Sequence, residues 1–156
     1  MNQTIRISKA EFIDLEEILA LQKKAYLSEA AIYDDYSIPP LHQTLPSIQK
    51  EYEDAYVLKA VTLDNQIVGS VRLTIHDGYA IIWKLIVDDR FQNLGIARKL
   101  LTEIEAIGKQ KVSRLELFTG FRSEKNIHIY TSTGYKEFKR EQLTDKVTLV
   151  YLEKFV

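Results

Sequence analysis

The segment RFQNLGIARKLL, residues 90–101, combines a basic, amide-rich run with one glycine and leads directly into an amphipathic helical pattern. The first backbone N–H groups of a helix have no partner inside the helix, and with the positive end of the helix dipole they favour an anion. Gly95 lets the backbone approach a ligand closely, and Ala97 keeps the first turn slim. Arg90 and Arg98 add positive charge. These residues predict a binding site for a pyrophosphate group.

This pattern has limited specificity by itself, because many helices begin near a glycine for steric reasons alone. The loop does not have the glycine and Gly-Lys-Ser/Thr spacing of a P-loop, and the chain contains no GxGxxG. Nucleoside triphosphates and dinucleotides are therefore disfavoured as the ligand.

Hydrophobic periodicity predicts the elements that must position this loop. Apolar residues recur at helical spacing over 14–27, where Asp14 and Glu17 have the spacing of a capping box. A proline-containing stretch predicted as a loop, EAAIYDDYSIPPLHQTLP, leads into a second short helix over 44–54. Two strand-like runs, VLKAVTL and IVGSVRLTI, then lead through an Asp-Gly turn into YAIIWKLIV, an apolar strand expected to be covered on both faces.

The second half of the chain completes this pattern. A helix over 95–110, the strand RLELFT, a helix over 124–133 and two final strands follow in order. Strands first and strand–helix–strand units second predict a mixed α/β fold around one twisted, mostly antiparallel sheet flanked by helices. The length of 156 residues suits one domain, 1–156.

Composition excludes several function classes. A formal net charge of -1 argues against a broad electrostatic interaction with nucleic acid. The chain has no cysteine, which excludes disulfides, thiolate zinc sites and a cysteine nucleophile, and its three histidines lack metal-site spacing. No apolar run approaches the length of a membrane span, and the N-terminus lacks the apolar core of a signal peptide. We therefore expect a cytoplasmic protein with no metal and no nucleic-acid or membrane partner.

Residues 87–101 resemble the signature loop of the GNAT acyltransferases, commonly written Q/R-x-x-G-x-G/A. Here the loop reads V-x-D-x-F-Q-x-x-G-I-A, followed by two leucines in the helix. The opening IRISKAEFIDLEEI is similar to the family's first strand and helix, and SEKNIHIYTSTGY, residues 123–135, resembles its later motif. Asp89 replaces a frequent proline, and Ser123 stands where the family often has asparagine. The resemblance implies the element order strand, two helices, three strands, helix, strand, helix, two strands.

In this family, acetyl-CoA lies in a wedge where the third strand of the meander parts from the strand after the loop helix. Carried over, the wedge lies between residues 79–87 and 114–119, and unpaired backbone groups there hold the pantetheine arm as an added strand would. The resemblance implies three groups of cofactor-binding residues: Leu85, Ile86 and Val87 for pantetheine; Gln92, Asn93, Leu94, Gly95, Ile96, Ala97 and Arg98 for the pyrophosphate; and Ser123, Asn126 and Tyr130 on the far wall.

The implied reaction is direct acyl transfer from a thioester to an amine in a ternary complex. Tyr130 matches the family's position for the general acid that protonates the departing thiolate, although a helix tyrosine can also simply pack its ring. Glu116, on the strand beside the wedge, is one candidate for the base. It can equally pair with Lys84, and a chain of water molecules can serve instead of a dedicated base.

The stretch AAIYDDYSIPPLHQT is expected to select the acceptor. Tyr33, Asp34 and Asp35 can hold a cationic amine by charge and by cation–π attraction, or they can belong to a solvated loop with aromatic anchors. The acceptor class stays open between a small-molecule amine and a protein or peptide amine. A non-catalytic acyl-CoA-binding regulatory module is the alternative function. Final strands such as VTLVYLEKF often pair between copies in this family, so a homodimer is a further expectation.

Overall fold

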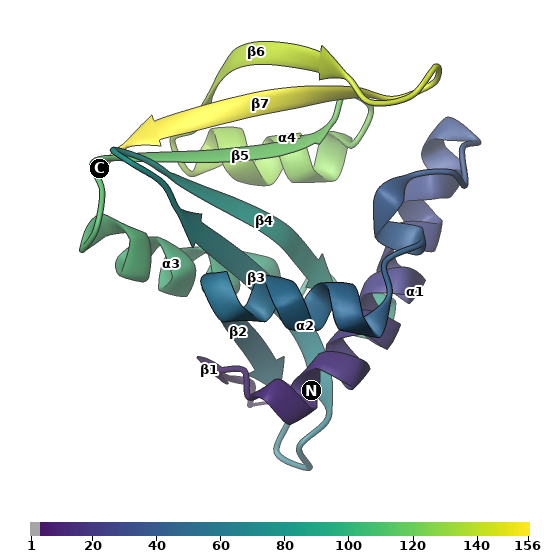
Figure 1. Cartoon of the computed structure of the whole chain (residues 1–156), viewed down its shortest axis with the longest axis vertical. Helices are drawn as coiled ribbons and strands as arrows, with labels where there is room; N and C mark the ends of the chain where they lie inside the picture. The colour runs from purple at the N-terminus through teal and green to yellow at the C-terminus, as the bar shows by residue number, and fades with distance from the viewer. Residues whose placement is uncertain (1–3) are drawn as a thin grey trace.

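A seven-stranded sheet in the order β1-β2-β3-β4-β5-β7-β6 forms the centre of the computed structural model, which describes residues 4–156 (Figure 1). Its strands are β1 (Arg6–Lys9), β2 (Tyr56–Val61), β3 (Ile67–Ile75), β4 (Ala80–Val87), β5 (Arg114–Gly120), β6 (Lys136–Gln142) and β7 (Thr148–Phe155). All neighbouring strands are antiparallel except β4 and β5, which are parallel. The predicted fold class and the predicted order of the elements are confirmed.

Four helices cover the two faces of this sheet. They are α1 (Leu15–Tyr33), α2 (Leu45–Asp54), α3 (Ile96–Lys109) and α4 (Glu124–Ser132). The helices α1 and α2 lie on one face and α3 and α4 on the other, as Figure 1 shows. Each layer has its own core because strand side chains alternate between faces: Ile86 packs toward α1, whereas its neighbour Val87 packs toward α3.

The first helix is longer than its sequence pattern predicts. Residues 29–33, predicted as loop, form the last turns of α1, and Asp34 ends the helix in a left-handed conformation with φ 50°. This extension is stabilised by packing, because Ala30 and Tyr33 are buried with Ile38 and Val147 in a third apolar cluster. Tertiary contacts thus override the weak local signal.

The predicted capping box between Asp14 and Glu17 is wrong. The Glu11 N–H donates to Asp14 Oδ2 over 2.7 Å, which places the box three residues earlier, at a short 3-10 turn over Phe12–Asp14. Glu17 Oε2 instead accepts from the backbone N–H of Ile67 over 2.9 Å. Its carboxylate therefore joins α1 to the start of β3.

The sheet splits between β4 and β5. These strands pair only where Ala80–Ile82 meet Leu115–Leu117, and their remaining edges face each other without pairing. A bulge in β4 accompanies the split: the register with β3 shifts between Ser70 and Arg72, and Lys84 adopts a left-handed φ of 53°. The predicted wedge between 79–87 and 114–119 is confirmed.

Candidate active site

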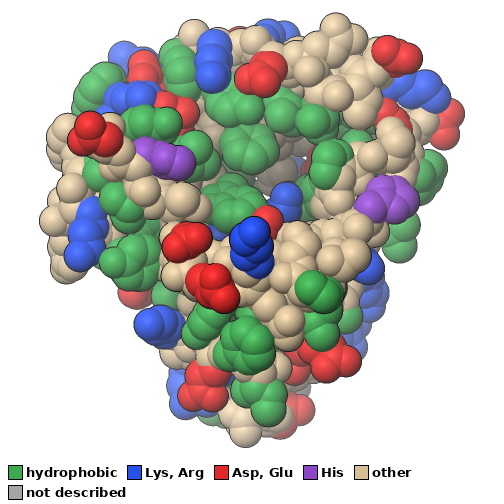
Figure 2. All heavy atoms as spheres, in the orientation of Figure 1, with side chains coloured by type: hydrophobic (Ala, Val, Ile, Leu, Met, Phe, Trp, Pro, Cys, Tyr) green, Lys and Arg blue, Asp and Glu red, His purple; other side chains and the backbone are tan. Residues whose placement is uncertain are grey.

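A cleft of about 920 Å³ occupies the split. Its walls come from the parted ends of β4 and β5, the loop leading into α3, one side of α4, the last turns of α1 and part of β7. Figure 2 shows a hollow in the face that carries α2, ringed largely by hydrophobic side chains. Elements distant in the sequence thus enclose one site.

One end of the cleft is built from free backbone donors. The first helical bond of α3 runs from the Lys99 N–H to the Gly95 carbonyl over 3.0 Å, and no side chain caps this helix. Within residues 4–156, nothing accepts from the backbone N–H groups of residues 95–98. Gly95 has φ 82°, a Cβ there would meet no atom within 4 Å, and residues 95–98 all line the cleft.

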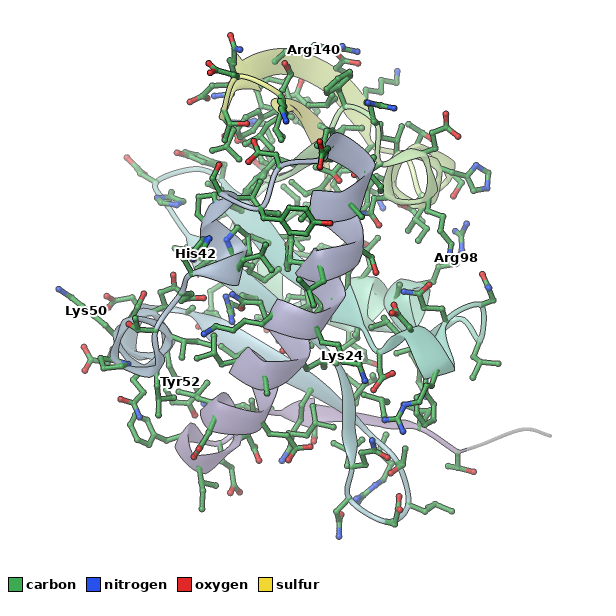
Figure 3. All side chains as sticks on the ribbon, turned by 90° about the vertical axis from the view of Figure 1, so that its right-hand side faces the viewer. Lys24, His42, Lys50, Tyr52, Arg98 and Arg140 are labelled. Carbon is green, nitrogen blue, oxygen red and sulfur yellow. The ribbon has the colours of Figure 1, made fainter. Side chains whose placement is uncertain are left out.

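Polar side chains complete this end. Arg98 and Lys125 both line the cleft, and Lys125 Nζ donates to Gln92 Oε1 over 3.0 Å, which links α4 to the loop before α3. Figure 3 places Arg98 near the start of α3, in the region between α3 and α4. Two cations beside uncapped amides form a site suited to a phosphate or pyrophosphate anion.

Tyr130 lies on the cleft wall opposite β4. Its side chain is buried, with its ring edge-on to Tyr135 at a centroid separation of 6.2 Å. Among residues 4–156, no group is hydrogen-bonded to its hydroxyl. Burial raises the pKa of Tyr130 above its ordinary value, and Tyr26 and Glu29 nearby raise it further. The phenol therefore stays protonated at neutral pH.

A carboxylate that the sequence analysis missed lies beside Tyr130. Glu29 lines the cleft from α1, and its Oε2 accepts from Ser123 Oγ over 2.5 Å. Tyr33 is hydrogen-bonded to the same Ser123 oxygen at 3.2 Å. The spacing of Tyr26, Glu29 and Tyr33 puts all three on one helical face, but the prediction of residues 29–33 as loop conceals this signal in the sequence.

The β4 bulge brings an ammonium group into the cleft. Lys84 is half-buried, and its Nζ lies 5.6 Å from the Tyr26 ring centroid and 5.5 Å from that of Trp83. Burial lowers the pKa of Lys84 to about 8, and the neighbouring Arg72 cation contributes to the same shift. Arg72 itself is fully buried and donates from Nη2 to Gln22 Oε1 over 2.7 Å.

Most predicted cofactor-binding residues line the cleft. They are Leu85, Ile86, Val87, Gln92, Asn93, Gly95, Ile96, Ala97, Arg98, Asn126 and Tyr130. Leu94 is exposed outside the lining, and Ser123 lies behind it as the partner of Glu29. Asn126 Nδ2 donates to Thr119 Oγ1 over 3.2 Å and so fixes α4 against β5.

Three predicted catalytic or acceptor residues lie elsewhere. Glu116 is outside the cleft lining, and its carboxylate pairs with Arg114 over 2.6 Å rather than with Lys84. Asp34 and Asp35 are also outside the lining, because they bind the β6–β7 turn: Lys146 Nζ donates to the Asp34 carbonyl over 2.9 Å, and Thr144 Oγ1 donates to Asp35 Oδ2 over 2.5 Å. Tyr33 alone of the predicted acceptor set lines the cleft.

The acetyltransferase (GNAT) family matches residues 15–135, and the chain belongs to this family. It is therefore an acyltransferase of the GNAT class.

Solved structures resemble the chain over nearly its full length. PaiA N-acetyltransferase from Thermoplasma acidophilum, in complex with coenzyme A, has a TM-score of 0.80 at 20% identity, with 98% of this chain and 99% of that chain covered. The ribosomal-protein-S18-alanine N-acetyltransferase from Escherichia coli has a TM-score of 0.78 at 18% identity, with 96% and 92% covered. No curated protein matches the sequence. At these identities the similarity establishes the fold.

The described residues contain neither a membrane-spanning helix nor a cluster of metal ligands. Over residues 4–156, no helix is long and apolar enough to span a bilayer. The same part of the chain contains no group of three or more His, Cys, Asp or Glu residues arranged to hold a metal ion.

Proposed function

We propose that this acyltransferase moves an acetyl group from acetyl-CoA to a primary amine by direct attack in a ternary complex. The observation that carries this proposal is the continuity of the unpaired β4 edge with the free amides of α3. Leu85 and Val87 offer backbone groups to the pantetheine amides, and the N–H groups of residues 92–98 lie one loop further on for the pyrophosphate. The backbone groups of β4 and of the loop before α3 thus match acetyl-CoA from its pantetheine arm to its pyrophosphate.

Tyr130 acts at the thioester end. When the amine nitrogen bonds to the carbonyl carbon, the C–S bond breaks and negative charge develops on sulfur. The phenol lies buried at the cleft wall and stays protonated, so it donates a hydrogen bond to that charge. Complete proton transfer to a thiolate with a pKa of about 8.5 is uphill from such a weak acid. Tyr130 therefore stabilises the leaving group mainly as a hydrogen-bond donor.

Glu29 acts as the general base for the attacking amine. An alkyl amine is mostly protonated at neutral pH and must lose a proton before it can attack. Glu29 lines the cleft close enough to Tyr130 to raise the pKa of that phenol. In this proposal it attracts the ammonium group and receives its proton through water, and Ser123 orients the carboxylate from behind. Glu116 has no part in this step, because Arg114 pairs with it outside the cleft.

A matched pair of glycine variants tests donor binding. Gly95 and Gly78 have φ values of 82° and 85°, and a Cβ at either position meets no atom within 4 Å. Alanine thus imposes similar backbone strain at both, but only Gly95 borders the cleft. Calorimetry with coenzyme A should show weaker binding for Gly95→Ala by about 10-fold, and unchanged binding for Gly78→Ala. Equal affinity in both variants contradicts the anion site.

Turnover is tested separately by thiol release from acetyl-CoA across a panel of primary amines. The proposal predicts amine-dependent thiol release with an N-acetylated product identified by mass spectrometry. Coenzyme A binding without turnover of any amine would favour a non-catalytic acyl-CoA-binding module.

A further inference from the structure

The part of the cleft between α1 and β7, called the acceptor side here, carries one positive and one negative side chain. These two side chains do not pair with each other. Lys84 projects from the β4 bulge and Glu29 from α1, and both line the cleft near Tyr26. Among residues 4–156, no ion pair joins Lys84 to any carboxylate. The cleft is thus polarised, with Tyr26 near both charges.

The surrounding groups do not neutralise Lys84. The Arg72 cation lowers the pKa of Lys84, and the Glu51 carboxylate opposes this shift but is itself paired with Arg72 over 3.4 Å. Two aromatic rings, those of Tyr26 and Trp83, lie within 6 Å of the ammonium and stabilise it only partly. A half-buried ammonium without a counter-ion is costly to maintain, and such groups concentrate at binding sites.

The rest of this side is apolar and rigid. Ile38, Pro39 and Pro40 line it from the α1–α2 connection, and the opposite wall is formed by Phe118, Leu149 and Tyr151 from β5 and β7. These side chains offer contact area and no further charge. The matching ligand therefore has an apolar body and a small number of charged groups.

We propose that the acceptor is an amine that also carries a carboxylate on an apolar or aromatic body, an amino-acid-type substrate, with Lys84 binding the carboxylate. Glu29 and Tyr130 then receive its amino end, so the two charges of the cleft match the two charges of a zwitterion. This inference rests on the proposed function and deepens it by naming the substrate class. Lys84 acts as a specificity-determining residue.

The turnover test compares L-phenylalanine with L-phenylalaninamide, which lacks the carboxylate charge. The quantity measured is the ratio of their kcat/KM values, in the wild type and in Lys84→Met. Because the ratio is compared between proteins, the different basicity of the two amines cancels. We expect the ratio to fall by at least about 10-fold in Lys84→Met, since a charge-assisted hydrogen bond is lost. Lys84→Arg should retain most of the preference.

A binding measurement separates this inference from the proposed chemistry. Calorimetry on the protein saturated with coenzyme A compares N-acetyl-L-phenylalanine and N-acetyl-L-leucine with their amides. The inference predicts tighter binding of at least one acid than of its amide, and loss of this difference in Lys84→Met. That result would stand even if no amine were acetylated, in which case only the proposed function fails.

Controls keep the test decisive. Lys23→Met removes an exposed lysine from α1 and should leave every ratio unchanged. Thermal unfolding and coenzyme A affinity show whether Lys84→Met is folded. A preference for the acid that persists in Lys84→Met, or no carboxylate-dependent binding or turnover with any of these compounds in the wild type, overturns the inference.

Discussion

The phenol of Tyr33 occupies the space that a side chain at residue 120 would need. A Cβ on Gly120 would lie 2.6 Å from Tyr33 Cζ, closer than real Cβ contacts allow. In this position the Tyr33 oxygen accepts from the Arg122 N–H over 2.9 Å and is hydrogen-bonded to Ser123 Oγ at 3.2 Å. The last turn of α1 is thereby joined to the end of β5 within the wall of the cleft.

Gly120→Ala is therefore expected to destabilise the protein by about 1–3 kcal/mol, because the ring must move and its hydrogen bonds are lost. The free energy of unfolding in urea measures the effect. In a Tyr33→Ala background the obstruction is gone, and the same substitution should cost less than about 0.5 kcal/mol. An equal cost in both backgrounds would show that the Tyr33 ring is not the cause.

The amino-acid sequence predicts the donor-binding end of the cleft better than its acceptor side. The loop before α3 was predictable because free amides, a glycine and an amphipathic helix occur within a dozen consecutive residues. Glu29 and Lys84 were not, because their roles depend on the unexpected length of α1 and on a bulge in β4 that reorients one side chain. Asp34 and Asp35 have the composition of an acceptor site, but two residues of the β6–β7 turn, Thr144 and Lys146, bind them instead. Local patterns predicted the elements, and long-range contacts determined which side chains reach the cleft.

Tyr130→Phe should lower kcat by about 10²-fold or more and leave the affinity for coenzyme A unchanged, because only the hydroxyl is lost and the ring can still pack against Tyr135. The measurement is steady-state thiol release, with calorimetry for the donor. Since burial raises the pKa of Tyr130, its ionisation should not limit the wild-type rate between pH 7 and pH 9. Full turnover in Tyr130→Phe would remove the residue from the mechanism.

Lys84→Met should increase the stability of the ligand-free protein at pH 7, because the buried ammonium is costly there. The pKa of Lys84 is lowered from 10.5 to about 8 in the folded protein, so between these values the unfolded chain binds more protons than the folded one. Stability from this group therefore rises with pH from about 8 toward 10.5, and the cost is fully present below pH 8. Thermal unfolding from pH 7.5 to pH 9.5 should show this rise in the wild type and a flatter profile in Lys84→Met. Identical profiles would mean that the ammonium is well solvated.

Asp35 links α1 to the β6–β7 turn, and its removal should weaken acid resistance. Hydrogen bonds from Ser37 and Thr144 lower the pKa of Asp35 from 3.8 to about 2, so the charged carboxylate stabilises the fold above pH 4 and this contribution is lost as the pH falls through 2. Asp35→Asn should reduce stability at pH 6 and flatten the decline between pH 4 and pH 2, as followed by circular dichroism.

Thr144→Val removes the partner across this link and also the acceptor for the Val147 N–H within the turn, so the double variant should lose less stability than the sum of the two single losses. Asp77→Asn, at an exposed position in the β3–β4 turn, is the control and should leave the acid profile unchanged.

Because α1 and β7 both line the acceptor side of the cleft, loosening their connection should also raise the acceptor KM while coenzyme A affinity is retained. Additive losses in the double variant, or a weakened donor affinity, would contradict a connection that acts only between α1 and the β6–β7 turn.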